Sequence, residues 1–205
     1  MIKGIIFDMG GVLIDLDYER CVASFLKLGF RNIRDYLDPC HQKGIYGDME
    51  SGKVSEDEFY EFALSQCNKG TRREDIDACM KSFYDGPSLK TGEYLRELKE
   101  RGYRIFMLSN NNPIMMRICK GDFSKAGIGL DDFFDKLFIS SSMKMLKPDS
   151  GIFLKAISET GLGTDELLFL DDSPRNTAGA RAVGLRSIDF VQGSSLRDAI
   201  EPELQ

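Results

Sequence analysis

Two acidic segments, one near each end of the chain, carry the residues best suited to do chemistry. Close to the N-terminus an apolar run ends in Asp8, and a glycine-rich turn with Gly10 and Gly11 follows at once. Close to the C-terminus a second apolar run ends in Asp171 and Asp172. A carboxylate at the tip of a buried strand is costly unless something binds it. The two segments therefore predict one site that holds a cation and an anionic substrate.

Two further polar segments lie between the acidic ones. Ser109 and Asn110 end a third apolar run, and Lys147 stands before Pro148 in a loop that follows a shorter apolar run. A carboxylate can attack phosphorus and form an acyl phosphate. A hydroxyl and a lysine can hold the phosphoryl oxygens and neutralise the charge that develops on them. Together with the aspartates, these residue types favour phosphoryl transfer.

A divalent cation fits the same residues. Mg²⁺ prefers hard oxygen ligands, which Asp8, Asp172 and a backbone carbonyl can supply. Three carboxylates and a phosphate dianion cannot share one pocket without a cation, and Lys147 alone brings too little positive charge. We therefore expect Mg²⁺ as the cofactor and a small-molecule phosphomonoester as the substrate.

Five apolar runs predict the buried strands that would position these groups. They lie at residues 2–7, 104–108, 137–139, 167–170 and 185–188. Helical patterns lie between them, for example one that begins at Thr91 as N-cap and one that runs from Asp149 to Gly161. This alternation predicts an α/β fold with a doubly wound parallel sheet, in which ligands bind outside the carboxyl ends of the strands.

The stretch from residue 17 to residue 86 breaks the alternation. It carries helical patterns at 19–28 and 56–64 and no convincing buried strand. Ser55, with Glu58 three residues later, has the pattern of a capping box at a helix start. We predict that residues 17–86 form a helical cap inserted after the first strand, whereas residues 1–16 and 87–205 form an α/β catalytic core.

The composition argues against several other classes of protein. Of 205 residues, 27 are basic and 33 are acidic, and no basic run stands out, so we expect no nucleic-acid partner. No apolar stretch reaches the length of a membrane span, and Asp8 falls where a signal peptide would need apolar residues. The five cysteines form no C-x-x-C pair, which favours reduced thiols in a cytoplasmic protein.

The four polar segments, taken in order, resemble the motifs of the haloacid dehalogenase superfamily, most of whose members are Mg²⁺-dependent phosphatases. The matching segments are 7–12, 108–110, 147–149 and 170–173. Each segment alone is weak evidence, whereas the ordered set spans the chain. Within the superfamily the chain is most similar to the branch of bacterial α-D-glucose-1-phosphate phosphatases and the N-terminal phosphatase domain of soluble epoxide hydrolase. The run at 50–55 in the predicted cap supports that placement.

The resemblance implies roles for the acidic residues and the turn. Asp8 would be the nucleophile that forms an aspartyl phosphate. Asp8, the Gly10 carbonyl and Asp172 would hold Mg²⁺, with Asp171 close by through water.

The resemblance also implies which groups bind the substrate. Ser109, Asn110 and Lys147 would bind the phosphoryl group, and the turn at Gly11 would let phosphate approach the backbone. The single histidine, His41, lies in the predicted cap. It is either an exposed loop residue or part of the lining of the substrate pocket.

One position departs from the usual motif. The superfamily's first motif normally carries a second aspartate that serves as general acid and base, and here that position is Gly10. The glucose-1-phosphatase branch resembles this chain in lacking that aspartate. Without a general acid, leaving groups that need little protonation should be favoured, so we expect an aldose 1-phosphate to react better than the corresponding 6-phosphate.

Two alternatives remain open on the sequence. A metal-independent haloacid dehalogenase would use Asp8 on carbon, although the acidic pair at Asp171 and Asp172 argues for a cation. A catalytically weak module that binds phosphate or a partner would explain Gly10, although such a module would be expected to lose Asp8 or Lys147 as well.

Overall fold

A five-stranded parallel sheet forms the centre of the molecule in the computed structural model, which describes residues 1–38 and 42–204. Its strands are β1 (Gly4–Phe7), β4 (Arg104–Ser109), β5 (Lys136–Ile139), β6 (Leu167–Asp171) and β7 (Arg186–Asp189). They stand in the order β5-β4-β1-β6-β7. The predicted doubly wound α/β fold is confirmed, and each predicted strand lies within two residues of an observed one.

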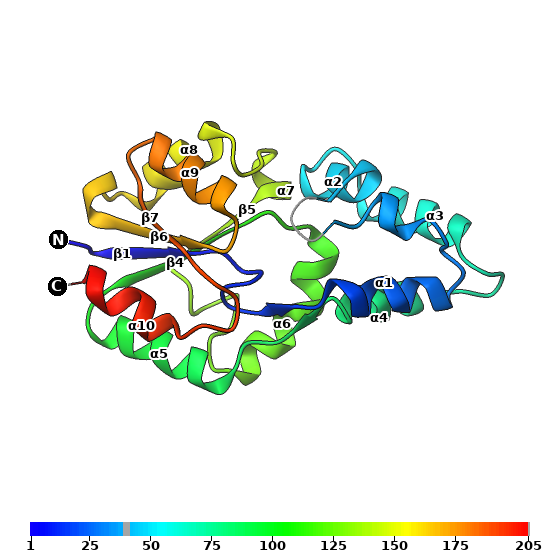
Figure 1. Ribbon diagram of the computed structural model, residues 1–205, viewed down its shortest axis with the longest axis horizontal. Coiled ribbons are helices and arrows are strands. Elements are labelled where there is room, and N and C mark those ends of the chain that lie inside the picture. The colour runs from blue at the N-terminus through cyan, green and yellow to red at the C-terminus, as the bar shows by residue number, and fades with distance from the viewer. Residues whose placement is uncertain (39–41, 205) are drawn as a thin grey trace.

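Helices cover both faces of the sheet (Figure 1). One face is covered by α5 (Leu89–Glu100), α6 (Pro113–Lys125) and α10 (Leu196–Ile200), and the other by α8 (Ser150–Thr160) and α9 (Pro174–Ala182). Side chains alternate along β1, so Ile5 and Phe7 pack under the first group of helices and Ile6 packs under the second. All three are fully buried, which explains why the strand reads as a continuous apolar run.

The register of the sheet brings the polar segments to one edge. Phe7, the last residue of β1, pairs with Met107 of β4 and with Leu170 of β6. Asp8 therefore lies level with the ends of both neighbouring strands. The chain after β1 leads to β4 on one side, and the chain after β6 leads to β7 on the other, so a crevice opens between β1 and β6.

The stretch between β1 and α5 is mainly helical and lies beyond the carboxyl edge of the sheet, opposite the two chain termini (Figure 1). It contains β2 (Asp15–Leu16), α1 (Tyr18–Lys27), the 3₁₀ turn η1 (Ile33–Asp35), α2 (Gly44–Glu50), α3 (Glu56–Gln66), α4 (Arg73–Lys81) and β3 (Tyr84–Asp85). The antiparallel pair of β2 and β3 joins the two ends of this stretch. That pairing supports the division at residues 16 and 86, which stays a proposal.

Within its described residues, the stretch from residue 17 to residue 86 holds no long buried strand, as expected, because β3 has only two residues and Asp85 is exposed. One local prediction is wrong. The N-cap of α5 is Ser88 rather than Thr91, because the Ser88 hydroxyl accepts a hydrogen bond from the Thr91 N–H at 3.0 Å. The capping box of α3 is confirmed, since Ser55 and Glu58 exchange hydrogen bonds.

The remaining elements complete the connections. They are α7 (Ser140–Met143), directly after β5, and the 3₁₀ turns η2 (Thr164–Glu166) and η3 (Glu201–Glu203). The helices of the described residues are all too short or too polar to cross a bilayer. The cysteines within the described ranges, Cys21, Cys67, Cys79 and Cys119, carry free thiols.

Candidate active site

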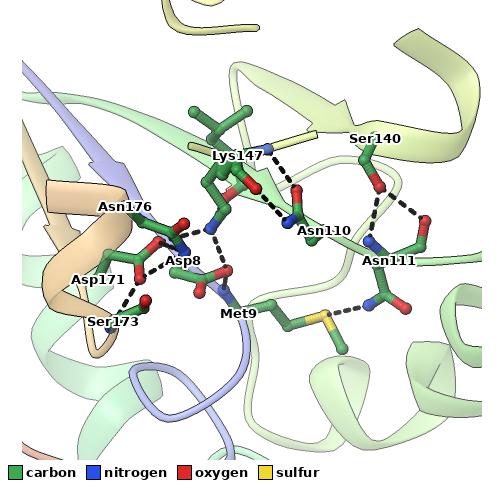
Figure 2. A network of polar contacts seen from close by, with 10 residues as sticks. Asp8, Met9, Asn110, Asn111, Ser140, Lys147, Asp171, Ser173 and Asn176 are labelled. Atoms are coloured by element: carbon green, nitrogen blue, oxygen red, sulfur yellow. Dashed lines mark hydrogen bonds and ion pairs between the residues drawn. The ribbon is translucent and has the colours of Figure 1, made fainter. Parts of the chain in front are cut away.

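Lys147 joins the two acidic segments at the carboxyl edge of the sheet (Figure 2). Its Nζ lies 2.9 Å from Asp8 Oδ1 and 2.6 Å from Asp171 Oδ2, and it donates to the Leu108 carbonyl at 2.9 Å. The Lys147 side chain is buried, so these contacts are shielded from water. Three segments far apart in the sequence are thus fixed around one ammonium group.

Asp171 is held from the other side as well. Its Oδ1 accepts hydrogen bonds from the Ser173 N–H at 2.9 Å and from Asn176 Nδ2 at 3.0 Å. The residue is completely buried at the end of β6. With these donors and Lys147 in place, the Asp171 carboxylate is satisfied within the protein and serves to orient the lysine.

Asn110 holds the backbone of the same lysine. Its Nδ2 donates to the Lys147 carbonyl at 3.0 Å, and its Oδ1 accepts from the Lys147 N–H at 2.8 Å. Both ends of the amide are therefore already in use, which sequence reasoning could not show. The neighbouring Ser109 is buried and lines a cavity that lies over the carboxylates.

Asp172 completes the acidic group. Asp8, Asp171 and Asp172 each place one carboxylate oxygen within 4.8 Å of the other two. Gly11 makes room for Asp172: its φ is +68°, and a Cβ there would lie 2.0 Å from Asp172 Oδ2. The Gly11 N–H donates to the Ile14 carbonyl at 2.8 Å. A glycine is therefore needed at position 11 because a larger side chain would clash with Asp172. The expected contact of Gly11 with phosphate stays a prediction.

The three carboxyls of Asp8, Asp171 and Asp172 face only one cationic side chain, Lys147, in this cluster of described residues. Burial raises the pKa of the Asp8 carboxyl to about 8, since the attraction of Lys147 does not offset the burial and the repulsion from Asp171. Burial alone would lower the pKa of Lys147, but Asp171 and Asp8 bring it above its ordinary value. Burial and the neighbouring Asp171 also raise the pKa of Asp172. A second cation beside Asp8 and Asp172 would restore the ionised form of both carboxyls.

A cavity of about 170 Å³ lies over these carboxylates, between the sheet edge and the helices α1, α2 and α4. The core side is formed by Asp8, Gly10 and Ser109, among others. On the opposite side the polar lining groups within the described residues include Gln42, Tyr46 and Glu50, and the remaining walls are mostly apolar: Ile14, Leu16, Cys21, Leu37, Met80, Phe83 and Met115. His41 lies outside the described residues, so its predicted role stays a prediction.

A second polar network connects the helical stretch to the core. Ser140 Oγ donates to the Glu50 carbonyl at 2.6 Å. The same oxygen accepts from the Asn111 N–H at 2.9 Å, and Asn111 Nδ2 contacts Met9 Sδ at 3.4 Å (Figure 2). Sequence reasoning assigned no function to Ser140, Asn111 or Glu50. Glu50 could have been found from the sequence, because it begins the run at 50–55 that resembles the cap of the superfamily. In the sequence, Ser140 and Asn111 resemble ordinary loop residues.

Residues 2–184 match the family model of the haloacid dehalogenase-like hydrolases. The chain belongs to this family. The resemblance inferred from the four motifs is therefore confirmed at the level of the family, while the branch within it stays a prediction.

Curated and solved relatives agree with this assignment. The chain is 33% identical over 201 residues to a D-ribitol-5-phosphate phosphatase of Bacteroides thetaiotaomicron, covering 98% of this chain and 97% of the relative. A wild-type haloacid dehalogenase family enzyme from the same organism, solved with magnesium and inorganic phosphate, superposes with a TM-score of 0.88 at 32% identity, covering 97% of this chain and 98% of that one. A HAD-like hydrolase of Porphyromonas gingivalis reaches 0.90 at 35% identity, covering 100% of this chain and 98% of that one.

Proposed function

We propose that the chain is a Mg²⁺-dependent phosphatase that hydrolyses a small phosphomonoester through a covalent intermediate on Asp8. The observation that carries the proposal is the buried Lys147, which joins Asp8 to Asp171 at the floor of a cavity large enough for a small molecule. Such a lysine can neutralise a phosphoryl group next to a carboxylate that is positioned to attack it.

The residues divide the chemistry between them. Asp8 attacks phosphorus, while the Lys147 ammonium and the Ser109 hydroxyl hold the phosphoryl oxygens. Asn110 and Asp171 position Lys147 through its backbone and its Nζ, respectively. Asn110 thus acts on the phosphate through the lysine, and direct contact with phosphate would require its amide to leave that backbone.

The donor set fits a magnesium ion. Asp8, Asp172 and the Gly10 carbonyl would hold it, and all are hard oxygen ligands. When bound, the ion supplies positive charge that offsets the phosphate and the carboxylates. Asp171 is occupied by Lys147, Ser173 and Asn176, which agrees with a place behind the ligands rather than among them. The solved relative that carries magnesium and phosphate supports this assignment.

The metal requirement is the test of this proposal. Wild-type protein should hydrolyse p-nitrophenyl phosphate with Mg²⁺ and lose nearly all activity after exhaustive chelation with EDTA, and added Mg²⁺ should restore it. Full activity after chelation, together with halide release from a 2-haloacid, would instead support the dehalogenase alternative. No turnover of any phosphate ester would support a silent binding module.

The substrate that we propose is a sugar or polyol phosphate. Two candidates have separate support: an aldose 1-phosphate suits the missing acid at Gly10, and a polyol 5-phosphate matches the name of the D-ribitol-5-phosphate phosphatase. Tyr46 lines the cavity, and its hydroxyl, which has no hydrogen-bond partner among the described residues, can bond to hydroxyl groups of either kind.

Replacement of Gly10 by aspartate measures how much the leaving group matters. A Cβ at Gly10 would lie 3.0 Å from the end of the half-buried Leu16 side chain, which can move aside. If wild type lacks a proton donor, the ratio of kcat/KM for glucose 1-phosphate over glucose 6-phosphate should fall in Gly10→Asp, because a general acid helps the poorer leaving group by about 10²–10⁴-fold. If another residue already donates the proton in wild type, the ratio should stay unchanged.

We also propose a cytoplasmic protein without a nucleic-acid partner. The support is its net charge of −6 and the free thiols of the described cysteines.

A further inference from the structure

The proposed reaction lacks a proton donor at the position where the motif usually supplies one. An alkoxide leaving group must take up a proton, and Gly10 has no side chain to give it. Asp8 attacks from the core, and the leaving oxygen of an in-line displacement departs on the opposite side of phosphorus. The donor should therefore come from the side of the cavity that faces the sheet edge, which α2 and its neighbours form.

Within the described residues, six ionisable side chains line the cavity. Three of them already have proposed roles: Asp8 is the nucleophile, Lys147 binds the phosphate, and Asp172 binds the metal. Burial raises the pKa of Tyr46 well above its ordinary value and that of Cys21 to about 12, so neither is an effective acid near neutral pH. The sixth group is Glu50, on whose carboxyl no described residue acts through a hydrogen bond.

The backbone around Glu50 is fixed to the core. The Ser140 hydroxyl donates to the Glu50 carbonyl at 2.6 Å and is itself held by the Asn111 N–H. Two residues later, Gly52 has a φ of +69°, and a Cβ there would lie 2.3 Å from the Ser141 carbonyl oxygen. The chain therefore rests directly on the segment after β5, so Glu50 is placed by rigid contacts rather than by a free loop.

The position of the side chain follows from α2. Tyr46 and Glu50 are one helical turn apart, so they share a face, and both line the cavity. The charged groups that act on Glu50 are Asp8 and Lys147 on the core side. Burial first, and then Asp8, raise the pKa of Glu50 to about 8, so it carries a proton at neutral pH.

We propose that Glu50 is the general acid and base of this enzyme and replaces the aspartate that is missing at Gly10. The inference rests on the proposed phosphatase function. As Asp8 forms its bond to phosphorus, the bond to the leaving oxygen breaks, and that oxygen keeps the electron pair and takes the Glu50 proton. Glu50 then accepts a proton from the water that attacks the aspartyl phosphate. The bond between phosphorus and Asp8 breaks, which returns the electron pair to Asp8 and releases inorganic phosphate.

The leaving-group dependence of Glu50→Gln tests the proposal. Glutamine keeps the shape of the side chain but cannot donate the proton. We measure the first-turnover rate of Asp8 phosphorylation for a series of aryl phosphates and for glucose 6-phosphate. The variant should lose about 10²–10⁴-fold with glucose 6-phosphate and far less with p-nitrophenyl phosphate, whose leaving group needs no proton. The plot of rate against leaving-group pKa should become steeper.

Two further variants separate catalysis from structure. Asp48 lies on the same helix, but its carboxylate pairs with Lys53 and does not line the cavity. Asp48→Asn should therefore leave the slope of rate against leaving-group pKa unchanged. Glu50→Asp keeps an acid that is one methylene shorter, so its slope should lie between those of wild type and Glu50→Gln.

Equal losses for all leaving groups in Glu50→Gln, or no loss, would overturn the proposal and assign Glu50 to binding or packing. An intermediate slope in Glu50→Asp keeps the test valid if the glutamine variant does not fold. Failure of the phosphatase proposal itself is a different result, because wild type would then release no phosphate from any member of the series.

Discussion

Replacement of Asp8 by asparagine should reduce turnover by about 10⁴–10⁶-fold on every substrate. The change removes the oxygen that attacks phosphorus and one of the proposed magnesium ligands, but keeps the shape of the side chain. The fold should persist, because Lys147 keeps its contacts to Asp171 and to the Leu108 carbonyl. The measurement is kcat with p-nitrophenyl phosphate, together with thermal unfolding of the same sample.

A covalent readout distinguishes nucleophilic attack from simple electrostatics. Wild type quenched in acid during turnover of a labelled phosphomonoester should retain label on Asp8, and Asp8→Asn should retain none. Asp165→Asn is a matched control, since Asp165 is exposed in η2, before the start of β6. Near-wild-type turnover in Asp8→Asn would remove the basis of the proposed mechanism.

The sheet and its polar edge were predictable because each rests on a local pattern. A strand buried on both faces must be apolar throughout, as in Ile5, Ile6 and Phe7, and the first polar residue then marks its end. The carboxyl ends of parallel strands meet at one edge, so Asp8 and Asp171 had to be neighbours. The strand order was not needed for that conclusion.

Contacts that depend on how the helical stretch rests on the core were not predictable. The bond from Ser140 to the Glu50 carbonyl joins residues 90 positions apart, and no sequence period connects them. The two hydrogen bonds of Asn110 to the Lys147 backbone likewise exist only once the loop after β5 has folded back. Sequence patterns identify the chemical type of such residues, whereas their partners are a property of the tertiary structure.

Loss of Lys147 should damage both catalysis and stability. In Lys147→Met, Asp8 and Asp171 remain buried without their cation, and an unpaired buried charge costs about 3–5 kcal/mol of the free energy of unfolding. Turnover should fall by about 10²–10³-fold, because the lysine stabilises charge that develops in the transition state. Urea unfolding and kcat/KM with p-nitrophenyl phosphate measure the two effects, and the exposed Lys155→Met is the matched control.

The pH dependence of that stability loss shows whether charge or packing is responsible. Lys147 lowers the pKa of Asp8, so its removal raises that pKa further above the ordinary value. A group whose pKa is raised in the folded state supports folding when protonated and loses that support as the pH rises through the folded pKa. The deficit of Lys147→Met relative to wild type should therefore be larger at pH 8 than at pH 4. Methionine fills most of the space of the lysine stem, so a deficit caused by packing would be the same at both values, and that result would make Lys147 a structural residue.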